Sequence, residues 1–458
     1  FSGLLRAGYS SKRHQLLLTH VTGYQQNQLA WLGASLDSIR VNPRVNANGA
    51  EDDQFLQNLS SLRHQWQIDS FSSFKTTLYY NRLQGNYDFD FNNFLGLPSS
   101  EEMYNYAFLS DMGGFTSQYR FARKRVTFAA GVQGYLYARR HTGSERSLGQ
   151  LYQNTGYKQE LAAWSQATYR MGKFILQADL QGRAVGFEYQ GDSGPSFDPL
   201  RWNFLNPKAK LTFELNDDIR IYLNTGRTGR EPTRNDMFAG NDDLPYDSLG
   251  RPALAFTDPE YVTQQELGFR ILRNKLDISA AVYHLSFQNE IVLSGEFGPN
   301  GLVLNRNVAR STRSGVEISY FYSLNAYQKR LLFSGNVALS RNRIREGSAI
   351  FEPVLSPQLI ANQNITLLWG NNEAWTAILH LRYQSRAWID FANQHELPAM
   401  LVPDLEGSYT WKKFRFSLHF TNLSNRSWLS NGQLDVYGNP TYHVQAPLGV
   451  FGGIVVRS

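Results

Sequence analysis

Hydrophobic and polar residues alternate along much of the chain with a period of two. Between Phe174 and Gln181, phenylalanine, leucine and alanine occupy the even positions, while mostly polar residues occupy the odd ones. The segments 333–340, 375–384 and 414–421 show the same alternation. Such a pattern places apolar side chains on one face of a β-strand and polar side chains on the other. It predicts an all-β protein, and no segment reads as a convincing amphipathic helix.

The pattern predicts about 19 strands. Their expected starts lie near residues 1, 14, 60, 74, 115, 126, 160, 174, 207, 219, 262, 276, 312, 331, 360, 374, 402, 414 and 446. Short turns are expected at 10–12, 70–73, 124–125, 172–173, 216–218, 273–275, 371–373 and 412–413. Long connections are expected near 25–57, 85–114, 142–158, 188–205, 228–260, 289–311, 344–358, 387–400 and 424–444.

Short turns and long connections therefore alternate, which puts every long connection at one end of the strands. This is typical of a transmembrane antiparallel β-barrel, which has short periplasmic turns and long outer loops. The apolar face then contacts lipid, the polar face lines a wet lumen, and Trp369 and Trp411 fall near strand ends, where aromatic girdles lie. A soluble propeller is the alternative, but its strands would be shorter and would repeat in sets of four.

The directions of the strands carry a further expectation. Both the first and the last strand run toward the short-turn end, whereas a bacterial barrel has an even number of strands with antiparallel neighbours at its seam. We therefore expect that an odd number of strands, together with a front portion of the protein, precedes Phe1.

Composition excludes several other classes. The chain has 458 residues, no cysteine and a formal charge of +6 that is spread along its length. The absence of cysteine excludes a disulfide scaffold and a cysteine-ligated metal. The dispersed charge does not indicate nucleic-acid binding, and no apolar run is long enough for a transmembrane helix.

A charged segment, NTGRTGREPTRNDMF, follows directly on the strand that starts near 219. On the lipid face each of its charges would cost about 2–4 kcal/mol at mid-depth. They are therefore expected in the mouth of the lumen or above the membrane, and Pro232 marks the exit from regular pairing. The charged residues are Arg227, Arg230, Glu231, Arg234 and Asp236.

Five blocks in series resemble TonB-dependent outer-membrane receptors of the iron-complex class. They are the segment around REPTRNDMF, DPEYVTQQELGFRI (258–271), YHLSFQNEIV (283–292), NRNVARSTRSGVEISY (305–320) and FTNLSNRSW (420–428). LAWLGASLDSI (29–39) is similar to an outer loop common in these receptors. The end of the chain, GGIVVRS, departs from the family by lacking a terminal aromatic residue.

The resemblance implies a barrel of about 22 strands around a globular plug, in the bacterial outer membrane. On this interpretation residues 1–458 are one domain, the last 19 or so strands of a monomeric barrel, without its plug. The implied function is active import of a large scarce solute, most naturally a ferric siderophore, and the implied partners are membrane lipid and TonB through a plug segment. No cofactor, catalysis or nucleic acid is implied. The alternatives are an ungated porin-like channel and, less well supported, a barrel hydrolase.

The candidate ligand- or plug-contacting residues lie in the lumen or the outer loops. For the arginines, contact with the plug wall is the simpler hypothesis, and direct binding of an anionic solute is the alternative, because the planar guanidinium donates hydrogen bonds in pairs. The candidates are Arg227, Arg230, Glu231, Arg234, Asp236, Trp31, Trp388 and His395.

Three further motifs have simpler explanations. GDSGP (191–195) resembles a serine-protease nucleophile loop, but its composition is that of a turn. The histidines show no metal-binding spacing, although His395 or His443 could ligate haem. The run 241–243 (NDD) could bind calcium, but a solvated turn is the simpler interpretation.

Overall fold

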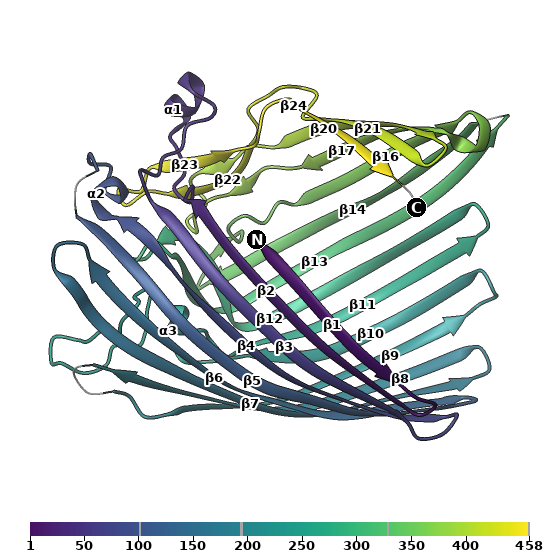
Figure 1. Cartoon of the computed structure of the whole chain (residues 1–458), viewed down its shortest axis with the longest axis horizontal. Helices are drawn as coiled ribbons and strands as arrows, with labels where there is room; N and C mark the ends of the chain where they lie inside the picture. Colours follow the sequence, from purple (N-terminus) through teal and green to yellow (C-terminus); the bar gives the residue numbers. More distant parts are fainter. Residues whose placement is uncertain (100–101, 193–195, 328, 457–458) are drawn as a thin grey trace.

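The computed structural model describes residues 1–99, 102–192, 196–327 and 329–456. Long strands follow one another in chain order and pair antiparallel with their sequence neighbours, forming a 20-stranded sheet that curves round as a wall (Figure 1). This confirms the all-β barrel architecture. The strands of the wall are β1 (Ser2–Ser10), β2 (His14–Gln28), β3 (Asp52–Gln67), β4 (Ser72–Asp90), β5 (Met103–Arg123), β6 (Val126–Glu145), β7 (Gly149–Met171), β8 (Phe174–Gly191), β9 (Leu200–Glu214), β10 (Ile219–Arg230), β11 (Glu260–Arg273), β12 (Leu276–Phe297), β13 (Val303–Ala326), β14 (Lys329–Glu346), the short β15 (Ala349–Phe351), β16 (Leu359–Trp369), β17 (Trp375–Gln384), β20 (Met400–Trp411), β21 (Phe414–Thr421) and β24 (Gly449–Val456).

The remaining elements are short. They are the helices α1 (Leu36–Val41), α2 (Phe91–Phe94) and α3 (Arg234–Met237), the 3-10 turn η1 (Asn371–Glu373), and two small hairpins, β18 (Ala387–Trp388) with β19 (Glu396–Leu397) and β22 (Leu429–Leu434) with β23 (Pro440–Val444). None of the helices in the described residues is long and apolar enough to cross a bilayer.

The short turns and the long connections lie at opposite ends of the wall, as the sequence predicts. We call the end with the long connections the mouth. It carries the segments 29–51, 231–259 and 422–448, with α1, α2 and the β22–β23 hairpin at the left of Figure 1. Several strands extend further toward the mouth than expected, so that the connection predicted near 142–158 is mostly ladder, with β6 running to Glu145 and β7 starting at Gly149. Backbone pairing continues there because it does not require lipid-facing side chains.

The described strands of this sheet do not close into a cylinder among themselves, as the sequence predicts. In the described residues β1 pairs only with β2, and β24 pairs only with β21. Both run toward the short-turn end, so they cannot form an antiparallel pair with each other.

Alternation along β8 shows which side of the wall faces lipid. Leu176 and Leu180 are 53% and 47% exposed, as expected for an apolar outer face. Nearer the mouth the apolar positions switch from even to odd, and Val185 and Phe187 are only 3% and 7% exposed. The inner face of β8 is therefore polar at mid-height and apolar at the mouth, where connections fold inward and cover it.

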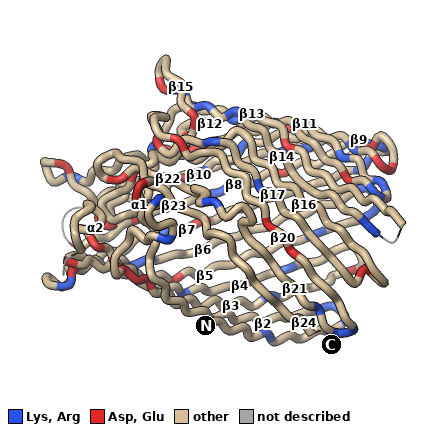
Figure 2. The backbone as a smooth tube through the Cα atoms, turned by 90° about the horizontal axis from the view of Figure 1, so that it is seen from above, with Lys and Arg blue, Asp and Glu red and all other residues tan. Residues whose placement is uncertain are grey.

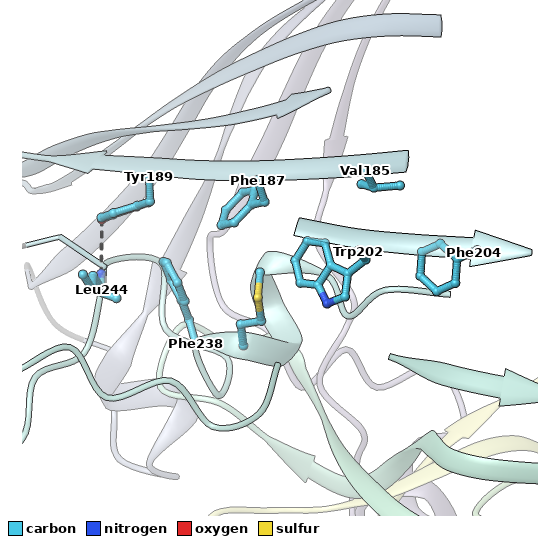
Figure 3. Packing of buried hydrophobic residues seen from close by; sticks show 8 residues of the cluster. Val185, Phe187, Tyr189, Trp202, Phe204, Phe238 and Leu244 are labelled. Carbon is cyan, nitrogen blue, oxygen red and sulfur yellow. Dashed lines mark hydrogen bonds between the residues drawn. The ribbon is translucent and has the colours of Figure 1, made fainter. Parts of the chain in front are cut away.

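Three clusters of buried hydrophobic residues lie among the connections at the mouth. The first joins β8 and β9 to the segment 231–259 (Figure 3). The second joins α1 to the hairpins β18–β19 and β22–β23, and the third joins the ends of β12–β14 to the segments that follow β15 and β17. These clusters give the mouth a packed structure of its own, which holds the polar groups described below.

Candidate functional site

The segment 231–259 leaves β10 and turns into the mouth through a helix of one turn. Pro232 cannot continue the ladder, and Thr233 then caps α3. The Thr233 hydroxyl accepts from the Asp236 amide at 3.3 Å, while the Asp236 carboxylate accepts from the Thr233 amide at 2.7 Å. This reciprocal capping box is what a Thr-x-x-Asp sequence favours. A second carboxylate oxygen of Asp236 accepts from the side chain of Asn305 on β13 at 2.7 Å, so α3 is also tied to the facing wall.

Hydrophobic side chains anchor this segment to β8 and β9. Met237 and Phe238 are completely buried. The Phe238 ring meets the Tyr189 ring edge-on with 5.1 Å between centroids, and the Tyr189 hydroxyl accepts from the Leu244 amide at 3.2 Å (Figure 3). The wall side of the cluster consists of Val185, Phe187, Tyr189, Trp202 and Phe204. Burial of this size fixes the position of the whole segment.

Asp242 fastens the same segment to β6 and β7. Its carboxylate lies 2.8 Å from Nδ1 of His141, accepts from the Tyr152 hydroxyl at 2.6 Å and lies 3.3 Å from Arg234. Burial raises the pKa of Asp242, but the hydrogen bond from His141 and the charges of His141 and Arg234 outweigh burial and hold this pKa below its ordinary value. The neighbouring Asp243 accepts from Tyr189 and from Asn154. The interpretation of 241–243 as a solvated turn is therefore wrong, because both carboxylates are bound by wall side chains.

Glu231 forms a second electrostatic anchor. This buried carboxylate lies 2.6 Å from Arg183 and 2.7 Å from Lys158. Burial raises the pKa of Glu231, but the hydrogen bond and charge of Lys158 and the charge of Arg183 more than compensate, so the pKa lies below its ordinary value. Arg183 also forms an ion pair with Glu160 at 3.0 Å, so its positive charge is balanced by two carboxylates of the chain.

Two adjacent cavities open between these anchors and the wall. Their volumes are about 340 Å³ and 430 Å³. Both are lined by Arg139, His141, Asp242, Asn300 and Leu302, so they lie on either side of the same residues, and we call the two together the vestibule.

The two halves of the vestibule differ in chemistry. The first half is lined in addition by Lys158, Arg234 and Trp202. The second half is largely aromatic, with Trp31, Phe55, Tyr87, Tyr106 and Phe108. Trp31 belongs to a cluster of rings in which its centroid is 5.8 Å from that of Phe89 and 5.2 Å from that of Phe297.

Several buried donors around the vestibule have no hydrogen-bond partner among the described residues. They are Nε of Arg139, Nη1 of Arg234 and Nδ2 of Asn300. The Arg139 guanidinium also lies over the Phe108 ring, 3.9 Å from its centroid. Oδ1 of Asn235, in the lining of the first half, is a buried acceptor that also has no partner in the described chain. Buried polar groups are almost always satisfied, so these atoms mark the vestibule lining as polar and incompletely satisfied. In the described residues no group of three or more His, Cys, Asp or Glu side chains is arranged to hold a metal ion.

The structure brings some of the candidate residues together. Arg234 and Glu231 line the first half of the vestibule, and Trp31 lines the second. Asp236 holds α3 beside them.

The other candidates lie apart from the vestibule. Arg230 pairs with Glu260 on β11 at 3.2 Å. Arg227 lies over the Tyr261 ring, 4.5 Å from its centroid, and by alternation shares the outer face of β10 with Leu223. Trp388 is on β18, and its ring lies against the guanidinium of Arg386. The backbone amide of His395 donates to the carboxylate of Asp390 at 2.6 Å. Ser193 of the GDSGP motif lies outside the described residues.

Sequence reasoning missed the residues that line the vestibule from the wall, above all Arg139, His141, Lys158 and Asn300. The sequence does contain a signal for Arg139 and His141. Both occupy odd positions of β6, which face inward, and in ARRHTG these positions carry basic side chains. No local signal marks Asn300, because its neighbours in the vestibule are distant in the chain.

Residues 5–423 match the model of the family described as TonB dependent receptor-like, beta-barrel. No curated protein matches the sequence. Among solved structures, the ferric citrate transporter FecA in the unliganded form superposes with a TM-score of 0.79 at 14% identity, covering 99% of this chain and 69% of that one. The copper transporter OprC gives 0.78 at 16% identity, covering 99% and 71%. The ferric yersiniabactin uptake receptor FyuA from Yersinia pestis gives 0.75 at 13% identity, covering 99% and 70%.

At these low sequence identities the superpositions establish only the fold. The match to the family model establishes membership of the family. The chain belongs to the TonB-dependent receptors, which sit in the outer membrane of Gram-negative bacteria.

Proposed function

We propose that this barrel takes up a bulky anionic chelate, in the first place a ferric siderophore, and that TonB energises the uptake. The observation that carries the proposal is the set of unpartnered donors of Arg139, Arg234 and Asn300 around an aromatic vestibule at the mouth. Guanidinium groups bind carboxylate and catecholate oxygens in pairs, and aromatic rings accommodate flat apolar parts of a chelate.

The same proposal assigns roles to the parts of the chain. Residues 1–458 act as one unit, the barrel, and the plug segment that TonB grips lies outside this sheet. Glu231 and Asp236 position the segment 231–259, while Arg234 and Trp31 contact the solute or the plug tip. TonB transmits force by strand addition to the plug segment.

Binding tests this directly. The receptor, purified in mild detergent, is titrated with ferric citrate, a ferric catecholate and a ferric hydroxamate while its tryptophan fluorescence is recorded. We expect ferric citrate or the ferric catecholate, which are anionic, to bind. The substitution Arg139→Gln should weaken that binding about tenfold. The matched control is Arg273→Gln, which removes the same charge at the short-turn end, where Arg273 pairs with Asp218.

Uptake tests the energised step. Cells that depend on this receptor should accumulate iron-55 from the bound chelate only when TonB is present. Uptake that persists without TonB would favour an ungated channel instead. Equal weakening by both arginine substitutions would show that the vestibule is not the binding site.

A further inference from the structure

A row of arginines lies on the outer face of the wall near the mouth. In the ladder between β13 and β14, Arg310 is opposite Arg345, while Arg343 and Arg341 follow at two-residue steps down β14. The next step is Leu339, which is 54% exposed on the lipid-facing side. Because alternate residues of a strand share a face, Arg341, Arg343 and Arg345 stand directly above the apolar band. Figure 2 shows basic positions along β13 beneath the projecting β15. We call these four residues the outer arginine row.

Among the described residues, no acidic side chain forms an ion pair with the outer arginine row. In the described part of the chain, none of the four guanidinium groups forms an ion pair or a side-chain hydrogen bond. Other arginines of these strands are paired, with Arg306 2.9 Å from Glu346 and Arg313 2.8 Å from Glu290. Like charges placed opposite each other on a sheet destabilise it, so the row is an arrangement that an external anion would stabilise.

A cavity of about 670 Å³ adjoins the row. It opens where the edge of β14 away from β13 has no partner strand among the described residues, between Leu339, the last residue paired with β16, and Ile344, the first paired with β15. Arg341 and Arg343 line it together with apolar Val316, Leu339, Ile350 and Trp388. Glu352 also lines the cavity and keeps its negative charge. Its carboxylate accepts from Gln358 at 2.9 Å and, in the part of the chain that the structure describes, forms no ion pair with either arginine. The cavity thus has a cationic rim, and Val316 and Leu339 in its lining continue the lipid-facing band. The rest of the lining is largely polar, with Ser314, Ser340, Asn342 and Asn393.

We propose that the outer arginine row binds the phosphate groups of a phosphorylated glycolipid of the outer leaflet, with the lipid's acyl chains against Leu339 and Val316. Guanidinium forks bind phosphate oxygens in pairs, and basic residues at the edge of the apolar band lie at the depth of lipid headgroups. A free phosphate would use the same guanidinium groups but not the apolar side chains of Leu339 and Val316.

Native mass spectrometry of the delipidated receptor tests the proposal. The protein in mild detergent is titrated with diphosphoryl lipid A, with lipid A stripped of phosphate, and with inorganic phosphate. The test variant is Arg341→Gln/Arg343→Gln. The matched control is Arg140→Gln/Arg201→Gln, because these two exposed arginines share the outer faces of β6 and β9 with Leu136 and Leu205 and also have no ion pair among the described residues. Heat-modifiable migration in gels checks that each barrel is folded.

We expect diphosphoryl lipid A to bind the test variant about tenfold more weakly than the unaltered protein, and the control variant to lose less than about threefold. Arg341→Lys/Arg343→Lys keeps the charge but loses the paired geometry, so its affinity should fall between the two. The proposal is overturned if stripped lipid A binds as tightly as the phosphorylated form. It is also overturned if inorganic phosphate competes at equal concentration, or if both glutamine variants weaken binding equally.

Discussion

Oδ1 of Asp242, between β10 and β11, lies 2.8 Å from Nδ1 of His141 on β6. This contact joins a connection to a strand four positions away round the wall, and Tyr152 on β7 donates to the same carboxylate at 2.6 Å. The connections at the mouth therefore fold inward and are held to the wall by specific side-chain contacts. The loss of each contact can be measured.

Replacing Asp242 with asparagine should release the segment 231–259 from the wall. The amide has no charge for Arg234 and one acceptor oxygen instead of two, so it cannot reproduce the carboxylate's contacts with Arg234, His141 and Tyr152 unchanged. An unsatisfied buried group costs about 1–3 kcal/mol. The chain has no cysteine, so a spin label on Ser248→Cys reports on this segment alone, and its spectrum should become more mobile.

Asp198→Asn is the control for that substitution. It removes a carboxylate at the same mouth from an exposed position. Equal mobility of the label in both variants would mean that general charge, and not the Asp242 contacts, holds the segment.

The same contact predicts a dependence on pH. The pKa of Asp242 is lower in the folded protein than its ordinary value, and that of Glu231 is lowered in the same direction. A depressed carboxyl pKa stabilises the folded state fully above the unfolded value of about 4 and loses this contribution as pH falls through the folded pKa. The Ser248→Cys label should therefore keep its spectrum from pH 7 to pH 5 and become mobile only below about pH 4.

Two observations would contradict this pH dependence. One is release of the segment between pH 5 and pH 7, which would assign control to a histidine. The other is an Asp242→Asn variant whose label still changes below about pH 4 to the same extent. Far-UV circular dichroism recorded in parallel separates release of the segment from unfolding of the wall.

Phe238 provides the apolar counterpart of these polar anchors. Its ring is fully buried against Tyr189, and Phe238→Ala should weaken docking by about 3–5 kcal/mol, as for other large-to-small changes at buried sites. Tyr246 is exposed on the same segment, so chymotrypsin should cut after it faster in the variant. Leu249→Ala, at a position that is exposed, should leave the rate unchanged. Equal rates in both variants would show that packing against β8 and β9 is not what holds the segment.

The sequence predicts the wall well because each strand carries its own periodic signal. Phe174, Val126 and Phe414 begin strands at the predicted places. Lipid on one side and water on the other impose alternation on every strand independently of its partners. The ends of the strands toward the mouth are less predictable. Above the membrane the backbone pairing continues, as between Glu145 and Gly149, but the side chains there are mostly polar on both faces and no longer alternate.

The mouth is harder to predict because its contacts join distant parts of the chain. One signal was nevertheless present in β8, where the apolar positions change from even, as at Leu180, to odd, as at Val185 and Phe187. A change of face within one strand means that lipid no longer covers the outer side and that something apolar covers the inner side. The pattern does not name Met237 and Phe238 as the covering residues, since nothing near β8 in the sequence specifies them.

Gly301 links the backbone of one connection to the aromatic half of the vestibule. Its φ of +74° lies in the left-handed region, and a Cβ added there would be 2.8 Å from the Phe89 ring and 2.9 Å from the Trp31 ring. Gly301→Ala therefore combines backbone strain of about 1–2 kcal/mol with a clash against rigid rings. Gly250→Ala is a matched control, because Gly250 has a φ of +72° and open space around its Cβ.

Both alanine variants should lose similar free energy to backbone strain, but only Gly301→Ala should displace Trp31. The emission of Trp31, obtained by subtracting the spectrum of a Trp31→Phe protein, should shift in the Gly301 variant and stay constant in the Gly250 variant. Chelate affinity should fall with that shift if the aromatic half of the vestibule contacts the solute. If Trp31 moves while affinity is retained, the rings act as packing for the mouth, and solute recognition belongs to the arginine half alone.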